Sequence, residues 1–286
     1  MFAKVIVGVD ASPNGRDAVA LAGTLAAADA TITLMHVRDT LPRVTRSLAP
    51  QSVTELEQTS RELLEAERAA TAVSARLASV EASSPGRGLH EEAEREGADL
   101  IVVGSCGRGL LGRVFAGDDT RAALNGAPCA VAVAARGYAQ REQPPALIGV
   151  GFDDGPESRA ALAVARVLAA RTGAAVHALE AVSLPLYAYN ALVAGVVTQE
   201  LIEDAGARLA AIPDVVGHAV SGFAGEELAI WSGQLDLLVI GSRGYGPLRR
   251  LVLGSTAQYL ERHARSSLLV LPRVAATPGG DATAPA

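Results

Sequence analysis

The sequence predicts an α/β protein of two similar domains, each a doubly wound parallel sheet covered by helices on both faces. The first observation is an internal repeat, because VVGSCGRGLLGRVFAGDDT from Val102 matches VIGSRGYGPLRRLVLGSTA from Val239. The second is the alternation of short apolar runs with amphipathic segments, which is typical of parallel strands joined by right-handed helical crossovers. The third is the length of 286 residues, enough for two domains of roughly 130 to 140 residues that each bury a core.

The first copy begins with a strand and a helix. Val5 to Val9 is an almost continuous apolar run ending at Asp10, which fits a parallel strand covered on both faces. Ser12 offers a hydroxyl to cap the next helix, and Pro13 suits its first turn. Residues 54–77 carry apolar side chains at helical spacing and predict one long amphipathic helix. The expected strands are 5–9, 31–37, 80–83, 99–103 and 130–134, and the other expected helices are 89–96 and 118–124.

The second copy repeats this order, because IGVGFDDGPESRAALAVA from Ile148 aligns without a gap on VIVGVDASPNGRDAVALA from Val5. The expected strands are 147–152, 175–181, 215–220, 235–240 and 268–271, and the expected helices are 156–171, 197–209, 226–231 and 256–264. The polar segment 137–145 is the predicted linker between a first domain, 1–136, and a second, 146–274. Residues 275–286 offer little to bury and are expected to form a mobile, disordered tail.

Composition narrows the function classes. Hydrophobic residues make up 49% of the chain and aromatic residues only 3%, so the core is expected to consist of Ala, Val, Leu and Ile. A formal net charge of -6 gives no general attraction for nucleic acid or anionic lipid. The apolar runs are short and the start of the chain lacks a signal-peptide pattern. We therefore expect a cytoplasmic protein with no nucleic-acid or membrane partner.

A glycine-rich loop in the second copy predicts an anion site. Gly241-x2-Gly244-x9-Gly254-Ser255 follows a predicted strand and precedes a predicted helix. Such glycines let backbone N–H groups approach an oxyanion, and the helix N-terminus adds favourable partial charge. Asp153 follows the first strand of this copy, at the edge where doubly wound sheets bind ligands. Cationic side chains lie in the same loop, at Arg243, Arg249 and Arg250.

The first copy keeps the spacing but changes the charge. Gly104, Gly107 and Gly117 match the glycines of the second copy, and Asp10 matches Asp153, but Asp118 and Asp119 follow the last glycine. A carboxylate about 4 Å from a phosphate would cost on the order of a few kcal/mol at an effective dielectric constant near 20. The first copy is therefore expected to bind nucleotide weakly or not at all, unless a divalent cation bridges the charges.

Other motif classes find no support. Residues 107–112 match G-x-G-x-x-G, but a dinucleotide fingerprint opens the first βα turn and needs an acidic residue about 20 positions later. No nucleophile elbow, zinc-protease or P-loop motif is present, and the five histidines lack metal-ligand spacing. Cys106 and Cys129 have no counterparts in the second copy, so no disulfide is expected. Cys106 is either an ordinary loop residue or a redox-sensitive thiol.

These residues resemble the universal stress protein family, of the ATP-binding type whose signature is G-x2-G-x9-G-[S/T]. The resemblance covers both halves and implies five-stranded parallel sheets, with the halves packed through their last strands as an intrachain pseudo-dimer; a homodimer of the whole chain is left open. It implies ATP, alone or with Mg²⁺, with backbone at Ala181 holding the adenine. The implied contacts are Asp153, Ala181, Gly241, Ser242, Arg243, Gly244, Arg250, Gly254, Ser255 and Thr256, with weaker counterparts Asp10, Val37, Gly104, Gly107 and Gly117.

The resulting functional hypothesis is an ATP-binding stress-response regulator that acts on an unknown protein partner and has no catalytic residue and no metal ligand. Two alternatives remain open from the sequence. One is an interaction scaffold that does not need nucleotide, in which the glycines only satisfy turn geometry. The other is a slow ATPase, for which Asp153 is the one candidate general base. Whether the ligand is ATP, ADP or cyclic AMP is also open.

Overall fold

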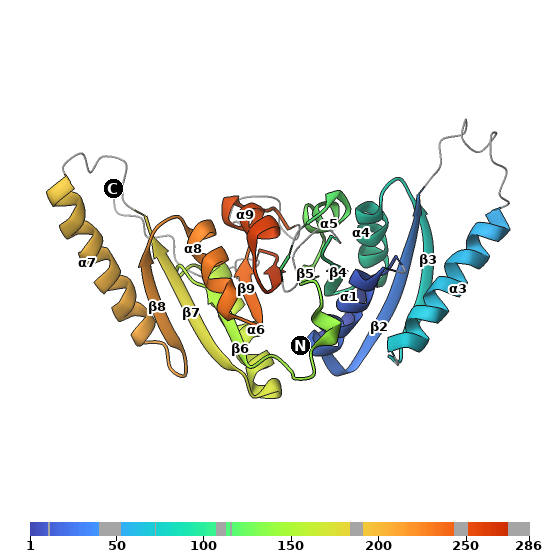
Figure 1. Ribbon diagram of the computed structural model, residues 1–286, viewed down its shortest axis with the longest axis horizontal. Coiled ribbons are helices and arrows are strands. Elements are labelled where there is room, and N and C mark those ends of the chain that lie inside the picture. The colour runs from blue at the N-terminus through green and yellow to red at the C-terminus, as the bar shows by residue number, and fades with distance from the viewer. Residues whose placement is uncertain are drawn as a thin grey trace, which may run out of the picture.

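The computed structural model describes residues 1–10, 12–39, 53–71, 73–106, 113–114, 116–183, 191–242 and 251–273 (Figure 1). The elements of the first half are β1 (Phe2–Gly8), α1 (Pro13–Leu25), β2 (Ala26–Asp39), α3 (Val53–Thr71), β3 (Arg76–Ala82), α4 (Pro85–Glu96), β4 (Leu100–Gly104), α5 (Asp118–Leu124) and β5 (Ala130–Ala134). The 3-10 helix η1 (Tyr138–Gln140) follows. The predicted tail, 275–286, lies outside the described residues.

The second half repeats this order. Its elements are β6 (Leu147–Gly151), α6 (Pro156–Thr172), β7 (Ala175–Val182), α7 (Ala191–Ala210), β8 (Val216–Ser221), α8 (Ala224–Trp231), η2 (Ser232–Gln234), β9 (Leu237–Gly241), α9 (Ser255–His263) and β10 (Ser267–Leu271). Each lies within a few residues of the corresponding predicted element, except that α7 begins earlier than the expected residue 197. The repeat seen in the sequence is therefore a repeat of structure.

The ten strands of the described residues form one sheet, in the order β3-β2-β1-β4-β5-β10-β9-β6-β7-β8. The pairings within each half are parallel, and the halves meet where β5 and β10 pair antiparallel, with Leu269 opposite Ala132. The sheet crosses the whole molecule, with α3 and α7 near its two ends (Figure 1). The predicted α/β fold of two five-stranded parallel units joined as a pseudo-dimer is confirmed.

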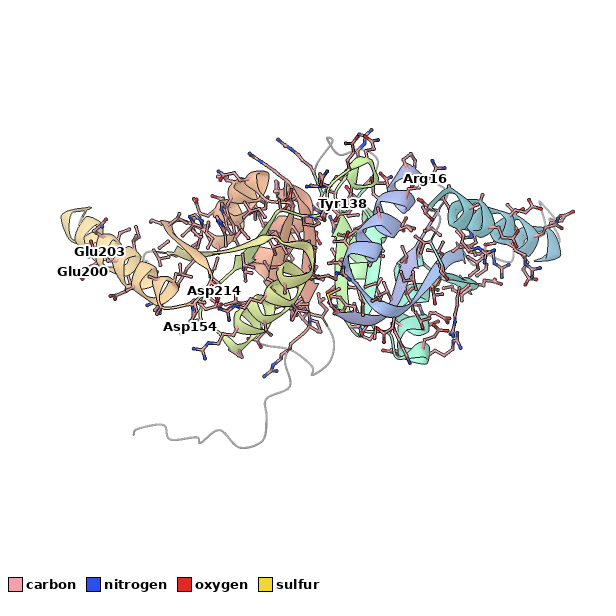
Figure 2. All side chains as sticks on the ribbon, turned by 90° about the horizontal axis from the view of Figure 1, so that it is seen from below. Arg16, Tyr138, Asp154, Glu200, Glu203 and Asp214 are labelled. Carbon is pink, nitrogen blue, oxygen red and sulfur yellow. The ribbon has the colours of Figure 1, made fainter. Side chains whose placement is uncertain are left out.

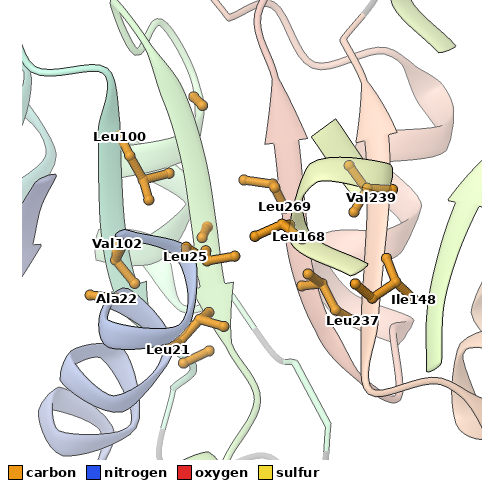
Figure 3. Close-up of a cluster of buried hydrophobic side chains, with 14 of the residues drawn as sticks. Leu21, Ala22, Leu25, Leu100, Val102, Ile148, Leu168, Leu237, Val239 and Leu269 are labelled. Carbon is orange, nitrogen blue, oxygen red and sulfur yellow. The ribbon is translucent and has the colours of Figure 1, made fainter. Parts of the chain in front are cut away.

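Helices cover both faces of this sheet. Helices α1, α3, α6 and α7 contribute buried side chains to one apolar cluster, and α4, α5, α8 and α9 contribute to the other. Both clusters contain residues of both halves, as Figure 3 shows for Leu25 and Leu100 beside Leu168 and Leu269. Small and branched aliphatic side chains dominate them, which suits close packing of helices on a sheet. The two halves therefore share their cores as well as their sheet.

The prediction of one long helix over 54–77 was wrong about where the helix ends. Helix α3 ends at Thr71, and Leu77 lies in β3 opposite Leu34 of β2. Val73 and Leu77 pack against one of the apolar clusters of the sheet. Leu77 belongs to a strand despite its helical spacing, because the ladder of backbone hydrogen bonds to β2 outweighs local helix propensity there.

The linker is docked more closely than its polar sequence predicts. The backbone N–H groups of Gly137 and Ala139 donate to the carboxylate of Asp17 on α1, at 2.7 and 2.8 Å. The ring of Tyr138 is buried, and its hydroxyl bonds to that of Thr24 at 3.1 Å. Figure 2 labels Tyr138 at the seam between the halves. The carboxylate of Asp17, itself buried, thus fixes the path of the chain into the second half.

Candidate functional site

The structure brings the described members of the predicted site together in the second half. Seven of them line one cavity of about 270 Å³, namely Asp153, Ala181, Gly241, Ser242, Gly254, Ser255 and Thr256. They come from the ends of β6, β7 and β9 and from the start of α9. This is the carboxyl edge of the parallel strands, as expected for a doubly wound sheet. Arg243, Gly244 and Arg250, like Arg249, lie outside the described residues.

The turn after β6 fixes the position of Asp153. One carboxylate oxygen of Asp153 accepts from the N–H of Gly155 at 3.0 Å. The backbone N–H of Asp153 donates to the hydroxyl of Ser158 at 3.3 Å. That hydroxyl donates to the carbonyl of Gly155 at 3.0 Å, within the first turn of α6. Asp154 takes a left-handed conformation, with φ of 61°. The turn thus holds the carboxylate of Asp153 exposed at the cavity, with its second oxygen available to a ligand.

The first glycine of each loop is needed for packing as well as for a ligand. A Cβ on Gly241 would lie 2.5 Å from the Cβ of Glu157 on α6. A Cβ on Gly104 would overlap the backbone carbonyl of Asn14 on α1. These contacts let the first helix of each half cross close over the strand tip. Both glycines were predicted as ligand contacts, and this close packing is an additional reason for glycine at both positions.

The start of α9 has the features of an anion site. Gly254 is the N-cap residue and has no side chain, so it makes no capping hydrogen bond to the N–H groups of the first turn. The first turn carries no acidic residue, so nothing there offsets the positive end of the helix dipole. The hydroxyl of Ser242 lines the same cavity, is buried, and has no hydrogen-bond partner among the described residues. Uncapped N–H groups and a buried hydroxyl therefore share one cavity.

The corresponding cavity of the first half is larger, at about 730 Å³. The described predicted residues Asp10, Val37, Gly104 and Gly117 all line it, and Gly107 lies outside the described residues. Asp118 and Asp119 line it too and form the acidic first turn of α5. The larger volume thus belongs to the half whose helix start already carries negative charge.

Sequence reasoning missed three residues of this first cavity. Arg121 and Arg262 line it, and Arg262 comes from α9 of the other half. Both are near Glu261, with Arg121 Nε to Glu261 Oε1 at 2.9 Å and Arg262 Nε to the same oxygen at 3.7 Å. His36 also lines the cavity and bonds through Nδ1 to the buried hydroxyl of Ser60. Burial lowers the pKa of His36 below its ordinary value of 6.5, although nearby Asp10 raises it.

The expected role of Ser12 was wrong. Ser12 stands before α1, but its hydroxyl makes no capping bond and has no partner among the described residues. Instead the carboxylate of Asp10 accepts from the N–H of Ser12 at 3.1 Å, the same turn that Asp153 makes. The Ser12 backbone angles, φ -86° and ψ 160°, are those of a normal N-cap. The N–H of Gly15, which a capping hydroxyl would accept, donates instead to the Ser12 carbonyl at 3.0 Å.

The two cysteines differ in their surroundings. Both are free thiols; Cys106 lines the cavity of the first half, and Cys129 is buried. Burial raises the pKa of the Cys129 thiol to about 12, which leaves it protonated at neutral pH. The expectation that no disulfide forms agrees with these two described free thiols, and Cys106 is the thiol that a small molecule in the cavity would meet.

Each half is hydrogen-bonded to the other beside these cavities. The N–H groups of Val114 and Ala116 donate to carbonyls of Ala264 and Glu261, at 2.9 and 2.7 Å. In the other direction, the N–H of Leu251 donates to the carbonyl of Ala127 at 2.8 Å, and the carbonyl of Leu251 accepts from the N–H of Gly126 at 2.9 Å. The segment that leads to each helix start is thus anchored on the opposite half.

The described residues contain no group of three or more His, Cys, Asp or Glu side chains that could hold a metal ion. Nor do they include a helix with the length and apolar character needed to cross a bilayer.

Comparisons with known proteins place this fold and its repeat in a family. The universal stress protein family matches residues 1–135 and again 147–272. A universal stress protein of Mycobacterium tuberculosis is 34% identical over 186 residues, which span 60% of this chain and 61% of that protein. A universal stress protein of Mycobacterium bovis matches to the same extent. This chain thus covers about three fifths of the length of these relatives.

Solved structures agree at the level of the fold. A universal stress protein from Archaeoglobus fulgidus superposes with a TM-score of 0.64 at 18% identity, over 95% of this chain and 98% of that one. A functionally unknown protein from Pseudomonas aeruginosa gives a TM-score of 0.62 at 18% identity, over 95% and 93% of the two chains. With the family match over both halves, the chain belongs to the universal stress protein family, as a tandem of two such domains.

Proposed function

We propose that this universal stress protein binds ATP in the cavity of its second half and acts as a nucleotide-dependent regulator rather than a catalyst. The observation that carries the proposal is the buried hydroxyl of Ser242, which has no hydrogen-bond partner among the described residues and shares a cavity with the start of α9 and the carboxylate of Asp153. A phosphate chain supplies acceptors for the Ser242 hydroxyl and for the N–H groups at the start of α9. Sugar hydroxyls supply donors for the carboxylate of Asp153.

The roles of the residues follow from their positions. The N–H groups of Ser255 and Thr256 at the start of α9 would donate to phosphate oxygens, with the hydroxyls of Ser242 and Ser255 beside them. The free oxygen of Asp153 would accept from the ribose. Ala181, at the end of β7, would hold the base through its backbone. Bound phosphate would order contacts around α9, whose far end is anchored to the first half, and so alter the surface offered to a partner.

The first half is proposed to bind nucleotide more weakly despite its larger cavity. Asp118 and Asp119 replace Ser255 and Thr256 at the helix start, and like charges there oppose a phosphate. Arg121 and Arg262 offset part of this charge, but both lie beside Glu261. The volume of the first cavity determines which ligands fit, but the negative charge of Asp118 and Asp119 makes its interaction with phosphate unfavourable.

An exchange of these helix starts tests the proposal. Isothermal titration of the full chain with ATP is expected to show binding that Ser255→Asp weakens by at least about tenfold, because one repulsion of about 1.4 kcal/mol suffices for that factor. The reciprocal variant Asp118→Ser controls for general damage and is expected to leave this binding intact. The absence of heat at millimolar ATP would contradict the proposal. Hydrolysis of ATP that requires Asp153, tested with Asp153→Asn, would replace it by a slow ATPase.

A scaffold that needs no nucleotide has its own supporting observation. Phe223 and Ile230 are 72% and 56% exposed. Phe223 is the N-cap residue that precedes α8, and Ile230 lies near the end of that helix. Large exposed apolar side chains suit a protein contact. In this alternative, partner capture is unchanged by ATP and is lost with Phe223→Ser.

A further inference from the structure

We propose that the seam between the two halves holds a second anion site, which binds a phosphate-sized oxyanion independently of the nucleotide cavity. The site is a cavity of about 260 Å³ on which three arginines converge, Arg136, Arg141 and Arg265. The buried hydroxyl of Ser266 lines it as well.

Tertiary structure alone brings these residues together. Arg136 follows β5 and Arg141 follows η1, whereas Arg265 and Ser266 lie between α9 and β10 of the second half. The bonds from the linker to Asp17 set the path of the segment that carries Arg136 and Arg141. The antiparallel pairing of β5 with β10 places the start of β10 beside the end of β5, as the bond from Ala135 N–H to the Ser267 hydroxyl at 3.1 Å shows.

The charge of the cavity favours an anion. Its lining contains three guanidinium groups and one carboxylate, that of Asp236, in a chain whose overall formal charge is -6. The oxygens of Asp236 are already used: one pairs with Arg141, and the other accepts from the N–H groups of Ala146 and Leu147 at 2.7 and 2.9 Å. Within the described residues Arg265 makes no ion pair. Its guanidinium is therefore available to a ligand.

Ser266 supplies the second, independent observation. Its side chain is 4% exposed, and its hydroxyl has no hydrogen-bond partner among the described residues. A buried hydroxyl without a partner is unfavourable and rare in native proteins. By contrast, the neighbouring hydroxyl of Ser267 accepts a backbone N–H. An oxyanion in the cavity would give Ser266 the acceptor it lacks.

The ligand class follows from the size and the donors. A volume near 260 Å³ accommodates a tetrahedral oxyanion with a few waters, each of which takes about 30 Å³ in the liquid. Arginine forks match phosphate oxygens through paired hydrogen bonds. The phosphate can be free or the terminal group of a larger monoester, and both present the same chemistry. Bound there, it would connect the linker arginines to Arg265 of the second half.

Titration of the full chain with inorganic phosphate at constant ionic strength, in chloride buffer, tests this site. Arg265→Gln and Ser266→Ala are each expected to weaken binding by about tenfold, the loss of one charge-assisted or buried hydrogen bond. Arg76→Gln, at an exposed arginine of the distant strand β3, is the matched control and is expected to change nothing. Phenyl phosphate in place of phosphate shows whether the site also accepts a monoester.

Ser266→Ala also separates a ligand role from a structural one. Because the Ser266 hydroxyl makes no hydrogen bond to any described residue, the variant without phosphate is expected to unfold at the same or a higher urea concentration than the parent chain. Three results would overturn the proposal: no phosphate binding at millimolar concentration, binding that Arg265→Gln and Ser266→Ala leave intact, or binding lost in Ser255→Asp instead, which would place the anion at the start of α9. None of them depends on whether ATP binds.

Discussion

Single glycines carry much of the packing in this protein. A Cβ at Gly104 would overlap the carbonyl of Asn14, which is backbone and has little room to move. Gly104→Ala is therefore expected to lower the free energy of unfolding by about 1–3 kcal/mol, as overpacking does elsewhere. Gly23→Ala is the control, because nothing lies within 4 Å of a Cβ there and the residue is within α1. It is expected to stabilise by about 0.5–1 kcal/mol, and urea titrations measure both.

Two histidines, His177 and His36, give the stability a pH dependence. His177 Nδ1 lies 3.0 Å from His218 Nε2, within hydrogen-bond distance. Burial first, and His218 second, lower the pKa of His177 below 6.5, and burial lowers the pKa of His36 too. The unfolded chain binds these protons more readily, so this part of the stability is present above pH 6.5 and is lost as the pH falls.

We expect the free energy of unfolding to decrease from about pH 6.5 towards about pH 5, and His177→Gln to reduce that slope. The fluorescence of Trp231, the one tryptophan in the sequence, reports the unfolding transition. An unchanged slope in His177→Gln would show that other groups carry the pH dependence.

At the scale of elements, the ion pair between α5 and α9 joins the two halves. The Glu261 side chain is 5% exposed, and that of Arg121 is 38% exposed. Arg121→Met leaves a buried carboxylate with only the weaker contact to Arg262, and is expected to lower the free energy of unfolding by about 2 kcal/mol. The double variant Arg121→Met with Glu261→Gln removes the charge and is expected to recover part of that loss. A double variant that is worse than the single one would contradict this account.

At the scale of the whole molecule, the halves are expected to unfold together. Leu268, Leu269 and Val270 of β10 pair with β5 and are fully buried, and both apolar clusters span the seam. Far-UV circular dichroism, which reports both halves, and Trp231 fluorescence, which reports the second, should therefore give one urea midpoint. Leu269→Ala is expected to shift both signals equally, with a loss of about 2–4 kcal/mol. Two separate midpoints would show that the domains are thermodynamically independent.

The sequence by itself determined what depends on near neighbours in the chain. Apolar runs and helical spacing located the strands and most helices, although β2 begins at Ala26 rather than at residue 31. The repeated glycine loops pointed to residues that do line one cavity, from Asp153 to Thr256. The resemblance added the pairing through the last strands. The end of α3 was mispredicted because Leu77 fits a helical pattern and a strand equally, and only β2 decides between them.

What the tertiary structure alone decided are contacts between residues far apart in the chain. Arg262 borders the cavity of the opposite half, Asp17 holds the linker, and three arginines meet at the seam. No local sequence pattern encodes these contacts, because they follow from the order of the strands in the sheet and from the antiparallel pairing of β5 with β10. The hydroxyl of Ser12 also differs from the local expectation: its position suits a cap, but it makes no capping bond, and the N–H of Gly15 donates to the Ser12 carbonyl.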